Sequence, residues 1–190
     1  MKQQYSEQQS FENINFSETR LSEDEYEKFT FSVCDFSNVD LSNVIFIDCD
    51  FVGCNFSLTK MNNTALRSIQ FKDCKLLGIH FNNCKQLLFE ASFDNCILNL
   101  SSFYKMKLKH TQFKNSSLHE VDFVETDLTS ARFDNCDMNG TVFENTILEK
   151  ADLRTAYNYS IDPEINRLKK ARFSSAGIPG LLHKYDIEIE

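Results

Sequence analysis

The chain has 190 residues, of which 25% are charged, and its formal net charge at pH 7 is −8. This length fits one modest domain, and five Gly and two Pro are too few for a flexible linker chain. The first ten residues are polar and no apolar run approaches the ~18 residues of a membrane span. We therefore expect a soluble cytoplasmic protein with no signal peptide.

A large apolar residue occupies every fifth position from near the start of the chain. A period of five fits neither the 3.6 residues of a helical turn nor the two-residue alternation of a strand, so it indicates a repeat architecture. In the first thirty residues, the positions two before the apolar ones are mostly residues that suit the small inward position poorly. Whether a regular first coil forms there is therefore left open. The apolar positions in this part are Phe11, Phe16, Leu21 and Tyr26.

The period is unbroken from Phe31 to Phe81, then resumes at Leu88 and runs to Leu153. The residue two positions before each large centre is nearly always small or β-branched, as in Cys34 and Thr59. A unit with one small and one large inward side chain can form one side of a square coil. Four units then return the chain to its starting side about 4.8 Å higher, where backbones pair as in a parallel sheet.

These units resemble the A(D/N)LXX repeat of the pentapeptide-repeat family from about residue 31 to 155. Examples are CDFSN at 34–38, VDFVE at 121–125, TDLTS at 126–130 and ADLRT at 151–155. The resemblance implies an all-β solenoid, a right-handed quadrilateral β-helix. We assign residues 1–157 to this β-helix, firmly from residue 31, and residues 158–190 to a C-terminal helical cap and dimerisation segment.

One irregular step separates Phe81 from the next centre, which lies seven residues later instead of five. Centres about twenty residues apart remain alike across this step, as in Leu66, Leu88 and Leu108. We predict that two inserted residues around 85–87 bulge outward and that Leu88 points into the core.

The cysteines and histidines do not form a recognisable reactive site. All the cysteines occupy the small inward position, where they act as small buried hydrophobes, with a regulatory thiol as the alternative. The histidines match no metal or triad motif, and His80 and His119 are expected to face outward. We expect no enzyme, cofactor or metal. The cysteines are Cys34, Cys49, Cys54, Cys74, Cys84, Cys96 and Cys136.

Asparagines and one aspartate recur at equivalent outward positions. Such side chains can bond backbone groups at corners and one another along a column, so we predict ladders of structural hydrogen bonds. The predicted ladders contain Asp73, Asn95, Asn115 and Asn135 in one column and Asn43, Asn63 and Asn83 in another.

Charge is banded along the chain. Residues 1–50 hold eleven acids and three bases (−8), residues 51–119 three acids and nine bases (+6), and residues 120–152 nine acids and two bases (−7). In a solenoid these bands are expected to form rings of alternating sign. The 120–152 band is short enough to approach the charge density of duplex DNA, about one charge per 1.7 Å of axis. Solvation of the surface explains the bands equally well, and the basic band could instead meet an acidic partner.

The tail predicts a helical cap. Asp162 and Pro163 suit an N-cap and the first helical position, and basic residues follow near the expected helix end. Apolar residues beyond it can cover the open end of the solenoid. The residues expected to form the cap or a dimer contact are Ile165, Leu168, Phe173, Leu181, Leu182 and Tyr185.

Two classes of function remain open. The resemblance is to Qnr-type and MfpA-like members, and it implies a homodimer joined through the C-terminal segment. Such a dimer would imitate DNA toward a bacterial type II topoisomerase, which is DNA gyrase or topoisomerase IV. It would inhibit the enzyme or protect it from quinolones. Qnr-type members carry two longer loops that this chain lacks. The alternative is a general protein-interaction scaffold, and neither reading has direct nucleic-acid or membrane contact. The expected partner-binding acids are Glu120, Asp122, Glu125, Asp127, Asp134, Asp137 and Glu144.

Overall fold

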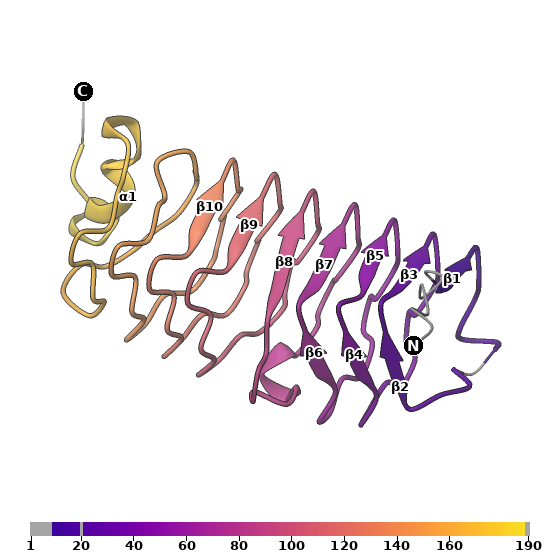
Figure 1. Cartoon of the computed structure of the whole chain (residues 1–190). Coiled ribbons are helices and arrows are strands. Elements are labelled where there is room, and N and C mark those ends of the chain that lie inside the picture. Colours follow the sequence, from indigo (N-terminus) through magenta and orange to yellow (C-terminus); the bar gives the residue numbers. More distant parts are fainter. Residues whose placement is uncertain (1–8, 20, 189–190) are drawn as a thin grey trace, which may run out of the picture.

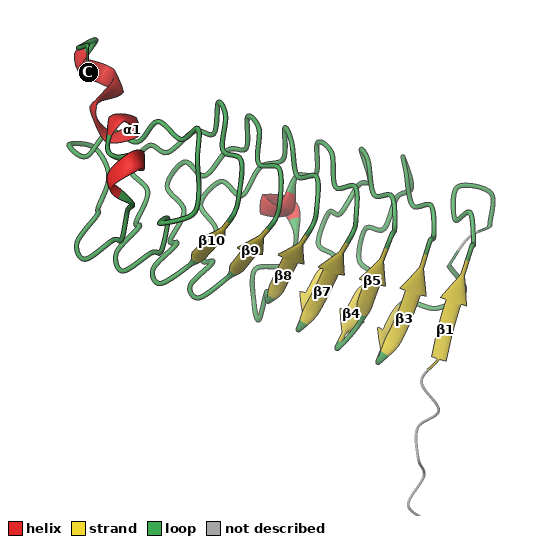
Figure 2. Cartoon of the chain, turned by 90° about the horizontal axis from the view of Figure 1, so that it is seen from above, coloured by secondary structure: helices red, strands yellow, loops and turns green. Residues whose placement is uncertain are grey.

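The computed structural model describes residues 9–19 and 21–188. Short strands stack in parallel along a rod, with small helical elements at its C-terminal end (Figures 1 and 2). The strands are β1 (Gln9–Glu12), β2 (Glu25–Glu27), β3 (Phe29–Ser32), β4 (Ile45–Ile47), β5 (Asp50–Val52), β6 (Ala65–Arg67), β7 (Ile69–Lys72), β8 (Ala91–Asp94), β9 (Gln112–Lys114) and β10 (Arg132–Asp134). The helical elements are α1 (Pro179–Leu182) and the 3₁₀ turns at Phe81–Asn83, Ser175–Gly177 and His183–Tyr185.

The chain forms the expected right-handed quadrilateral β-helix. One sheet has the order β1-β3-β5-β7-β8-β9-β10 and a second has the order β2-β4-β6. We number the four sides of the coil by their inward centres in one turn, Phe31 (first), Phe36 (second), Leu41 (third) and Phe46 (fourth), all buried. The seven-stranded sheet lies on the first side, and single bridges extend this ladder from Arg132 through residue 152 to residue 172.

Stacked aromatic rings fill the interior of the rod. Phe113 stacks on Phe133 with ring centroids 5.0 Å apart, and Phe103 stacks on Phe123 at 5.2 Å. Rings on opposite sides meet edge to face, as Phe113 on the first side and Phe123 on the third side do at 5.8 Å. Such pairs contribute about 0.5–1.5 kcal/mol each beyond the burial of their area. Because each coil packs only on its neighbours, the core is a continuous column.

The small inward residues satisfy backbone groups inside the rod. The Thr126 hydroxyl donates to the carbonyl of Phe103 at 2.7 Å, and the Cys74 thiol donates to the carbonyl of Phe51 at 3.3 Å. The acceptor lies 23 residues earlier in each case, in the coil before. A buried hydroxyl or thiol is thus paired, which removes most of the cost of burying it.

The corners of the coil use the left-handed backbone conformation, which Asn tolerates better than most residues. Asn115 has φ 50° and Asn135 has φ 52°. The predicted ladder is confirmed at two of its three steps, since Asn135 donates to Asn115 at 3.1 Å and Asn95 donates to Asp73 at 2.6 Å, whereas Asn115 donates to Asp94 at 3.2 Å. In the other column Asn63 donates to residue 43 at 2.8 Å, but the side chain of residue 83 accepts from its neighbour at residue 82.

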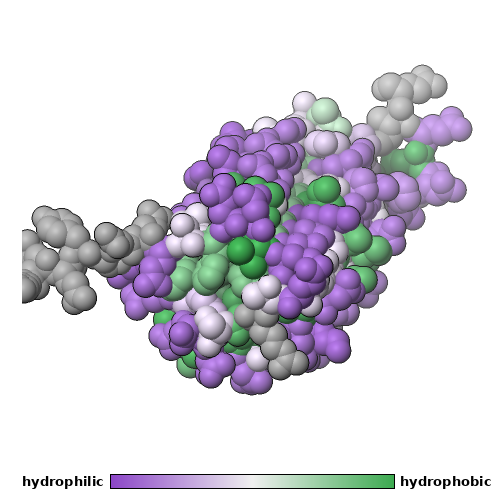
Figure 3. Space-filling view, turned by 90° about the vertical axis from the view of Figure 1, so that its right-hand side faces the viewer, coloured by the Kyte–Doolittle hydropathy of each residue, from purple (hydrophilic) through white to green (hydrophobic). Residues whose placement is uncertain are grey.

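The described part of the first thirty residues forms a coil. Strand β1 pairs with β3, and Asn15 bridges Asp35 in the next coil. Phe16 and Tyr26 are buried, whereas Phe11 is only half-buried because it lies at the end of the rod. Figure 3 looks at this end, where apolar atoms lie in the middle of a hydrophilic surround.

The structure at the inserted residues differs from the prediction at one expected core position. Pairing resumes as predicted, since Phe71 pairs with Phe93. Leu88, however, is 66% exposed and has φ 62°, so its prediction as an inward centre was wrong. The insertion forms a turn at residues 87–88, and Phe89 packs against the core instead, with its ring 6.3 Å from that of Phe81.

The prediction of a helix that begins at Asp162 and Pro163 is also wrong, because the chain forms another coil there. The Asp162 side chain accepts from the backbone of residue 164 at 2.8 Å, which closes a turn and caps no helix. Asn166 takes the small inward position, accepting from the backbone of Thr146 and donating to the carbonyl of Phe143, each at 2.9 Å. The coil therefore continues beyond residue 157, with bridges at residues 167 and 172.

The short C-terminal helix is α1, which begins later than expected. Its Leu181 packs against the core, and the amide of Ile161 donates to the carbonyl of Gly180 at 2.9 Å. Gly180 is required here, because an added Cβ would lie 2.4 Å from the carbonyl oxygen of Tyr159. These contacts hold the cap on the last coil, at the left of Figure 1.

We expect Phe123→Ala to destabilise the protein by about 3–5 kcal/mol, because it removes a fully buried ring and leaves a cavity. Phe123 has 0% exposure and stacks between Phe103 and Phe143. Equilibrium unfolding in urea measures the loss. A loss below about 1 kcal/mol would contradict the structural role of this column.

We expect the thiols to be unreactive in the folded protein. Burial raises the pKa of Cys84 and of Cys136 to about 12, so almost no thiolate forms near neutral pH. Ellman's reagent at about pH 8 should label the cysteines only when the chain is unfolded. Rapid labelling of any cysteine in the native protein would contradict this expectation.

Candidate interaction surfaces

A group of acids surrounds the third side of the coil. We call the acidic side the surface formed by Glu120, Asp122, Glu125 and Glu144. Asp122 accepts from the Val124 backbone and from the Ser102 hydroxyl, both at 2.9 Å, so its carboxylate is fixed in place. The Glu125 amide donates to the carbonyl of Glu144 at 2.8 Å, which sets these two acids on adjacent coils.

A glycine gives one of these acids room. Glu120 has φ 54° at the corner between the second and third sides, and Gly140 lies over it in the next coil with φ 70°. A Cβ added to Gly140 would lie 3.1 Å from Cγ of Glu120. Both Glu120 and Glu144 are exposed, and neither forms an ion pair within 4.0 Å among the described residues.

Other acids of the predicted band are paired with bases from the preceding coil. Glu125 lies 3.4 Å from Nζ of Lys105, and Asp127 lies 3.3 Å from Nζ of Lys109. The basic band and the acidic band therefore partly neutralise each other across the ladder. Such exposed pairs contribute only about 0.2–1 kcal/mol each.

Asp137 forms a further pair, with His119, at 2.9 Å. Burial alone would raise the pKa of Asp137, but hydrogen bonds from His119 and Asn158 outweigh it and lower that pKa. Asp137 belongs to the second side, Asp134 to the first and Asp127 to the fourth. Of the seven predicted acids, four thus share the acidic side and three lie elsewhere.

The acidic band is not a closed ring, because its two bases lie together at the edge between the fourth and first sides. Arg132 and Lys150 line a shallow cavity of about 440 Å³ with His110 and Arg172. Asp152 also lines it and is held by Arg172 at 3.3 Å. The sequence places Arg132 and Lys150 eighteen residues apart, so only their stacking in the coil shows that they meet.

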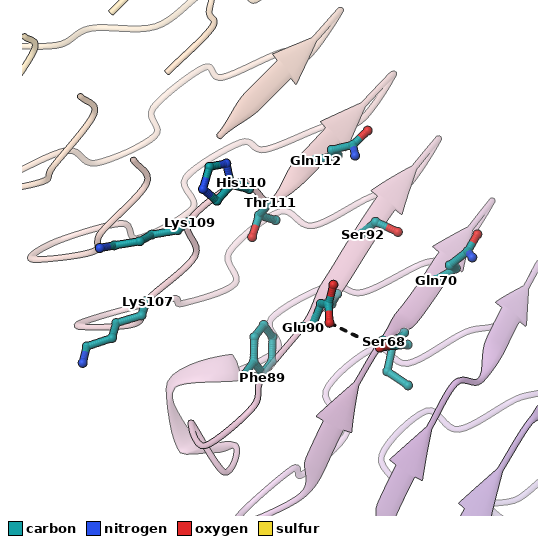
Figure 4. A pocket seen from close by; sticks show the side chains of 12 residues that line it. Ser68, Gln70, Phe89, Glu90, Ser92, Lys107, Lys109, His110, Thr111 and Gln112 are labelled. Atoms are coloured by element: carbon teal, nitrogen blue, oxygen red, sulfur yellow. Dashed lines mark hydrogen bonds between the residues drawn. The ribbon is translucent and has the colours of Figure 1, made fainter. Parts of the chain in front are cut away.

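A second cavity, of about 290 Å³, continues along the same edge and shares His110 and Gln112 with the first. Figure 4 shows Gln70, Ser92 and Gln112 in a row along β7, β8 and β9. Lys107 and Lys109 reach out on the other side of this cavity (Figure 4).

The floor of this second cavity is partly apolar. Phe89 and Ile69 line it, and Phe89 directly follows the turn of the insertion. Glu90 points across it and accepts from the Ser68 hydroxyl at 3.2 Å, drawn as a dashed line in Figure 4.

The predicted cap and dimer residues divide into two groups. Leu168, Phe173 and Leu181 are half-buried against the core, and Leu182 is half-buried as well. Ile165 is 48% exposed and lies at the same end of the rod.

Tyr185 is 52% exposed, and its hydroxyl donates to Glu164 at 3.0 Å. Lys184 joins the same cluster, 2.6 Å from Glu164 and 2.8 Å from Asp162. These bonds fasten the cap while leaving its outer apolar surface uncovered.

Within residues 9–19 and 21–188, no group of three or more His, Cys, Asp or Glu side chains is arranged to hold a metal ion. His80 is exposed, as expected, and His119 is half-buried against Asp137. Among the same described residues, none of the helices has the length and the apolar composition of a membrane span.

The chain belongs to the pentapeptide-repeat family. It matches the family described as "Pentapeptide repeat region" over residues 24–89 and 86–156. No curated protein sequence matches it. The structure accounts for the family pattern, since each repeat supplies one side of the coil.

Several solved structures are similar in fold. Full-length QnrB1, described as a plasmid-mediated fluoroquinolone resistance protein, is 19% identical with a TM-score of 0.48, over 94% of this chain and 97% of that one. HetL, a pentapeptide-repeat protein involved in heterocyst differentiation regulation from Nostoc sp. strain PCC 7120, is 13% identical with a TM-score of 0.45, over 87% of this chain and 84% of that one. At these values the likeness carries no argument about function.

We expect Asp152→Asn to lower stability by about 0.5–1 kcal/mol, because both arginines that hold this carboxylate are half exposed. Hydrogen bonds from Arg154 lower the pKa of Asp152, and the charges of Arg154 and Arg172 act in the same direction. A lowered folded-state pKa gives stability that is present above the unfolded pKa of about 3.9 and lost as the pH falls through the folded pKa.

The difference in unfolding free energy between the native chain and Asp152→Asn should therefore be largest above about pH 4 and vanish in stronger acid. Asp134→Asn is the matched control, since Asp134 is exposed on the first side of the preceding coil and forms no ion pair within 4.0 Å among the described residues. Equal effects of the two substitutions at every pH would contradict the role of the arginine pairs.

Proposed function

We propose that this protein is a non-enzymatic rod that binds other proteins through its outward side chains. The large inward positions are buried in the core, so a partner can contact only the outer surface and the two ends of the rod. The observation that carries the proposal is the acidic side, where Glu120 and Glu144 are exposed and without ion pairs in the described chain. The repeat backbone holds these charges at fixed positions, which a binding surface requires.

The more specific proposal is that the acidic side imitates DNA toward a bacterial type II topoisomerase such as DNA gyrase. Successive coils rise by about 4.8 Å, against one charge per about 1.7 Å in duplex DNA. Several acids per coil are needed to approach that density, and the acidic side carries Asp122, Glu125 and Glu144 within about one coil. The partner would then be the DNA-binding surface of the enzyme, which is basic.

A homodimer would lengthen this surface. Ile165, Tyr185 and Ile187 are 48%, 52% and 55% exposed at the C-terminal end, and Ile178 is 43% exposed. Contact between two such ends would bury these apolar groups. It would also bring the acidic sides of the two protomers toward one two-fold axis. A role in the response to quinolones is the consequence that can be tested.

A general interaction scaffold with no role at a topoisomerase is the second candidate. It is favoured by the ion pairs that occupy Glu125 and Asp127, because paired acids imitate DNA less well. This candidate requires neither a dimer nor the acidic side.

We expect the purified protein to inhibit supercoiling by DNA gyrase, and a variant of the acidic side to lose this effect. Glutamine and asparagine keep the size of each side chain, and the amide oxygen introduced by Asp122→Asn can still accept the turn hydrogen bond of the Val124 amide. Four removed charges should weaken inhibition by at least about tenfold if contacts of about 0.3–1 kcal/mol each are lost. The variant combines Glu120→Gln, Asp122→Asn, Glu125→Gln and Glu144→Gln.

The matched control removes four exposed acids at the other end of the rod and should inhibit like the native chain. Size-exclusion chromatography with light scattering tests the dimer, and circular dichroism confirms that each variant folds. Absence of any effect on supercoiling or quinolone response by the native protein would refute the topoisomerase proposal. The control combines Glu12→Gln, Glu18→Gln, Glu23→Gln and Glu25→Gln.

A further inference from the structure

The two cavities at the edge between the fourth and first sides form one continuous groove. They share His110 and Gln112, and we call their combined surface the basic groove. Its first-side wall follows successive paired positions from Gln70 to Arg172. Five steps of about 4.8 Å give a length of about 24 Å, which fits about seven residues of an extended peptide.

The basic groove is positively charged although the whole chain is negative. Its cations are Lys107, Lys109, Arg132, Lys150 and Arg172, with His110 added when protonated.

Two carboxylates lie among the cations, and both already have partners in the chain. Glu90 accepts from Ser68, and Asp152 is bonded by Arg154 and Arg172. Arg132, Lys150 and Lys107 form no ion pair within 4.0 Å among the described residues, so their charges are free for a ligand.

We propose that the basic groove binds an extended acidic peptide segment of a partner protein. The density of charge favours this ligand. Five cations set against Glu90, Asp152 and the Asp127 that pairs with Lys109 leave a net charge of two over about 24 Å, or one charge per about 12 Å. An extended peptide rises about 3.4 Å per residue, so a peptide with an acid at every third or fourth position has nearly the same density. Duplex DNA, with one charge per about 1.7 Å, has far more.

The neutral lining of the basic groove also suits a peptide. Gln70, Ser92 and Gln112 stand in a row along one wall (Figure 4), where their amides and hydroxyl can pair with backbone N–H and C=O groups. Phe89 offers one half-buried ring, which suits an apolar side chain between two acids. Single-stranded nucleic acid binds by stacking successive bases on exposed aromatic rings, and the groove lining contains one aromatic residue.

This inference deepens the proposed role as an interaction rod by naming one class of partner. It does not depend on the topoisomerase, because the basic groove and the acidic side occupy different parts of the coil. The two proposals can therefore fail separately. Loss of gyrase inhibition in the acidic-side variant alone would leave the groove untouched, and loss of peptide binding in a groove variant alone would leave the acidic side untouched.

A labelled heptapeptide with Glu at every third position and Thr elsewhere tests the proposal by fluorescence anisotropy. We expect binding that weakens with added salt and is absent for the peptide with Gln in place of Glu. Removing Arg132 and Lys150 together, as Arg132→Gln and Lys150→Gln, should weaken binding by about tenfold, from two contacts of about 0.7 kcal/mol each.

The matched control is the pair Lys60→Gln and Lys75→Gln, which removes the same charge from exposed positions on the third and second sides. It should change the affinity by less than about twofold. Thermal unfolding shows that both variants fold. Equal weakening by the two variants, equal binding of the Gln peptide, or no binding at millimolar protein would overturn the proposal. Tighter binding of an oligothymidylate of matched length would overturn it in favour of nucleic acid.

Discussion

The square cross-section of the coil fixes both the length of each repeat and the kind of side chain at each inward position. Each side is five residues long because the interior admits one large and one small side chain per side, and the backbone must then turn. Phe113, stacked between Phe93 and Phe133, shows the consequence, because its ring meets the same kind of ring above and below. Any residue too large or too small for its column would open a cavity or push the coils apart.

This constraint separates the stabilising residues from the functional ones. The inward positions hold aromatic rings and methyl groups, together with thiols and hydroxyls that donate hydrogen bonds to backbone carbonyls. Side chains able to bind a partner are therefore confined to the outer surface. Neighbouring outward residues along a column come from coils about 4.8 Å apart, which makes ion pairs such as Lys105 with Glu125 possible between distant segments. The alignment of successive coils thus decides which charged residues become neighbours on the surface. This alignment produces both the acidic side and the basic groove.

The irregular places in the repeat are where the surface becomes distinctive. The two-residue insertion exposes Leu88 and turns Phe89 toward the core, and Phe89 also lines the basic groove. At the other end of the rod, Gly180 allows α1 to pack closely over Tyr159 and close the last coil. Both features change the shape of the rod without interrupting its core.

The five-residue period, the columns of inward residues and the buried cysteines were predictable from the chain, because each depends on spacing along it, and the asparagine ladders were predictable in part for the same reason. The sequence did not determine that Phe89 replaces Leu88, since both are large and apolar and the path of an inserted turn depends on its neighbours. It predicted a helix after Asp162, because a local cap signal cannot reveal that Asn166 will bond Thr146 and Phe143 in the previous coil. The pairing of the acids and the shared position of Arg132 and Lys150 were not predictable from the chain, because stacking of the coils brings together residues that lie far apart in sequence.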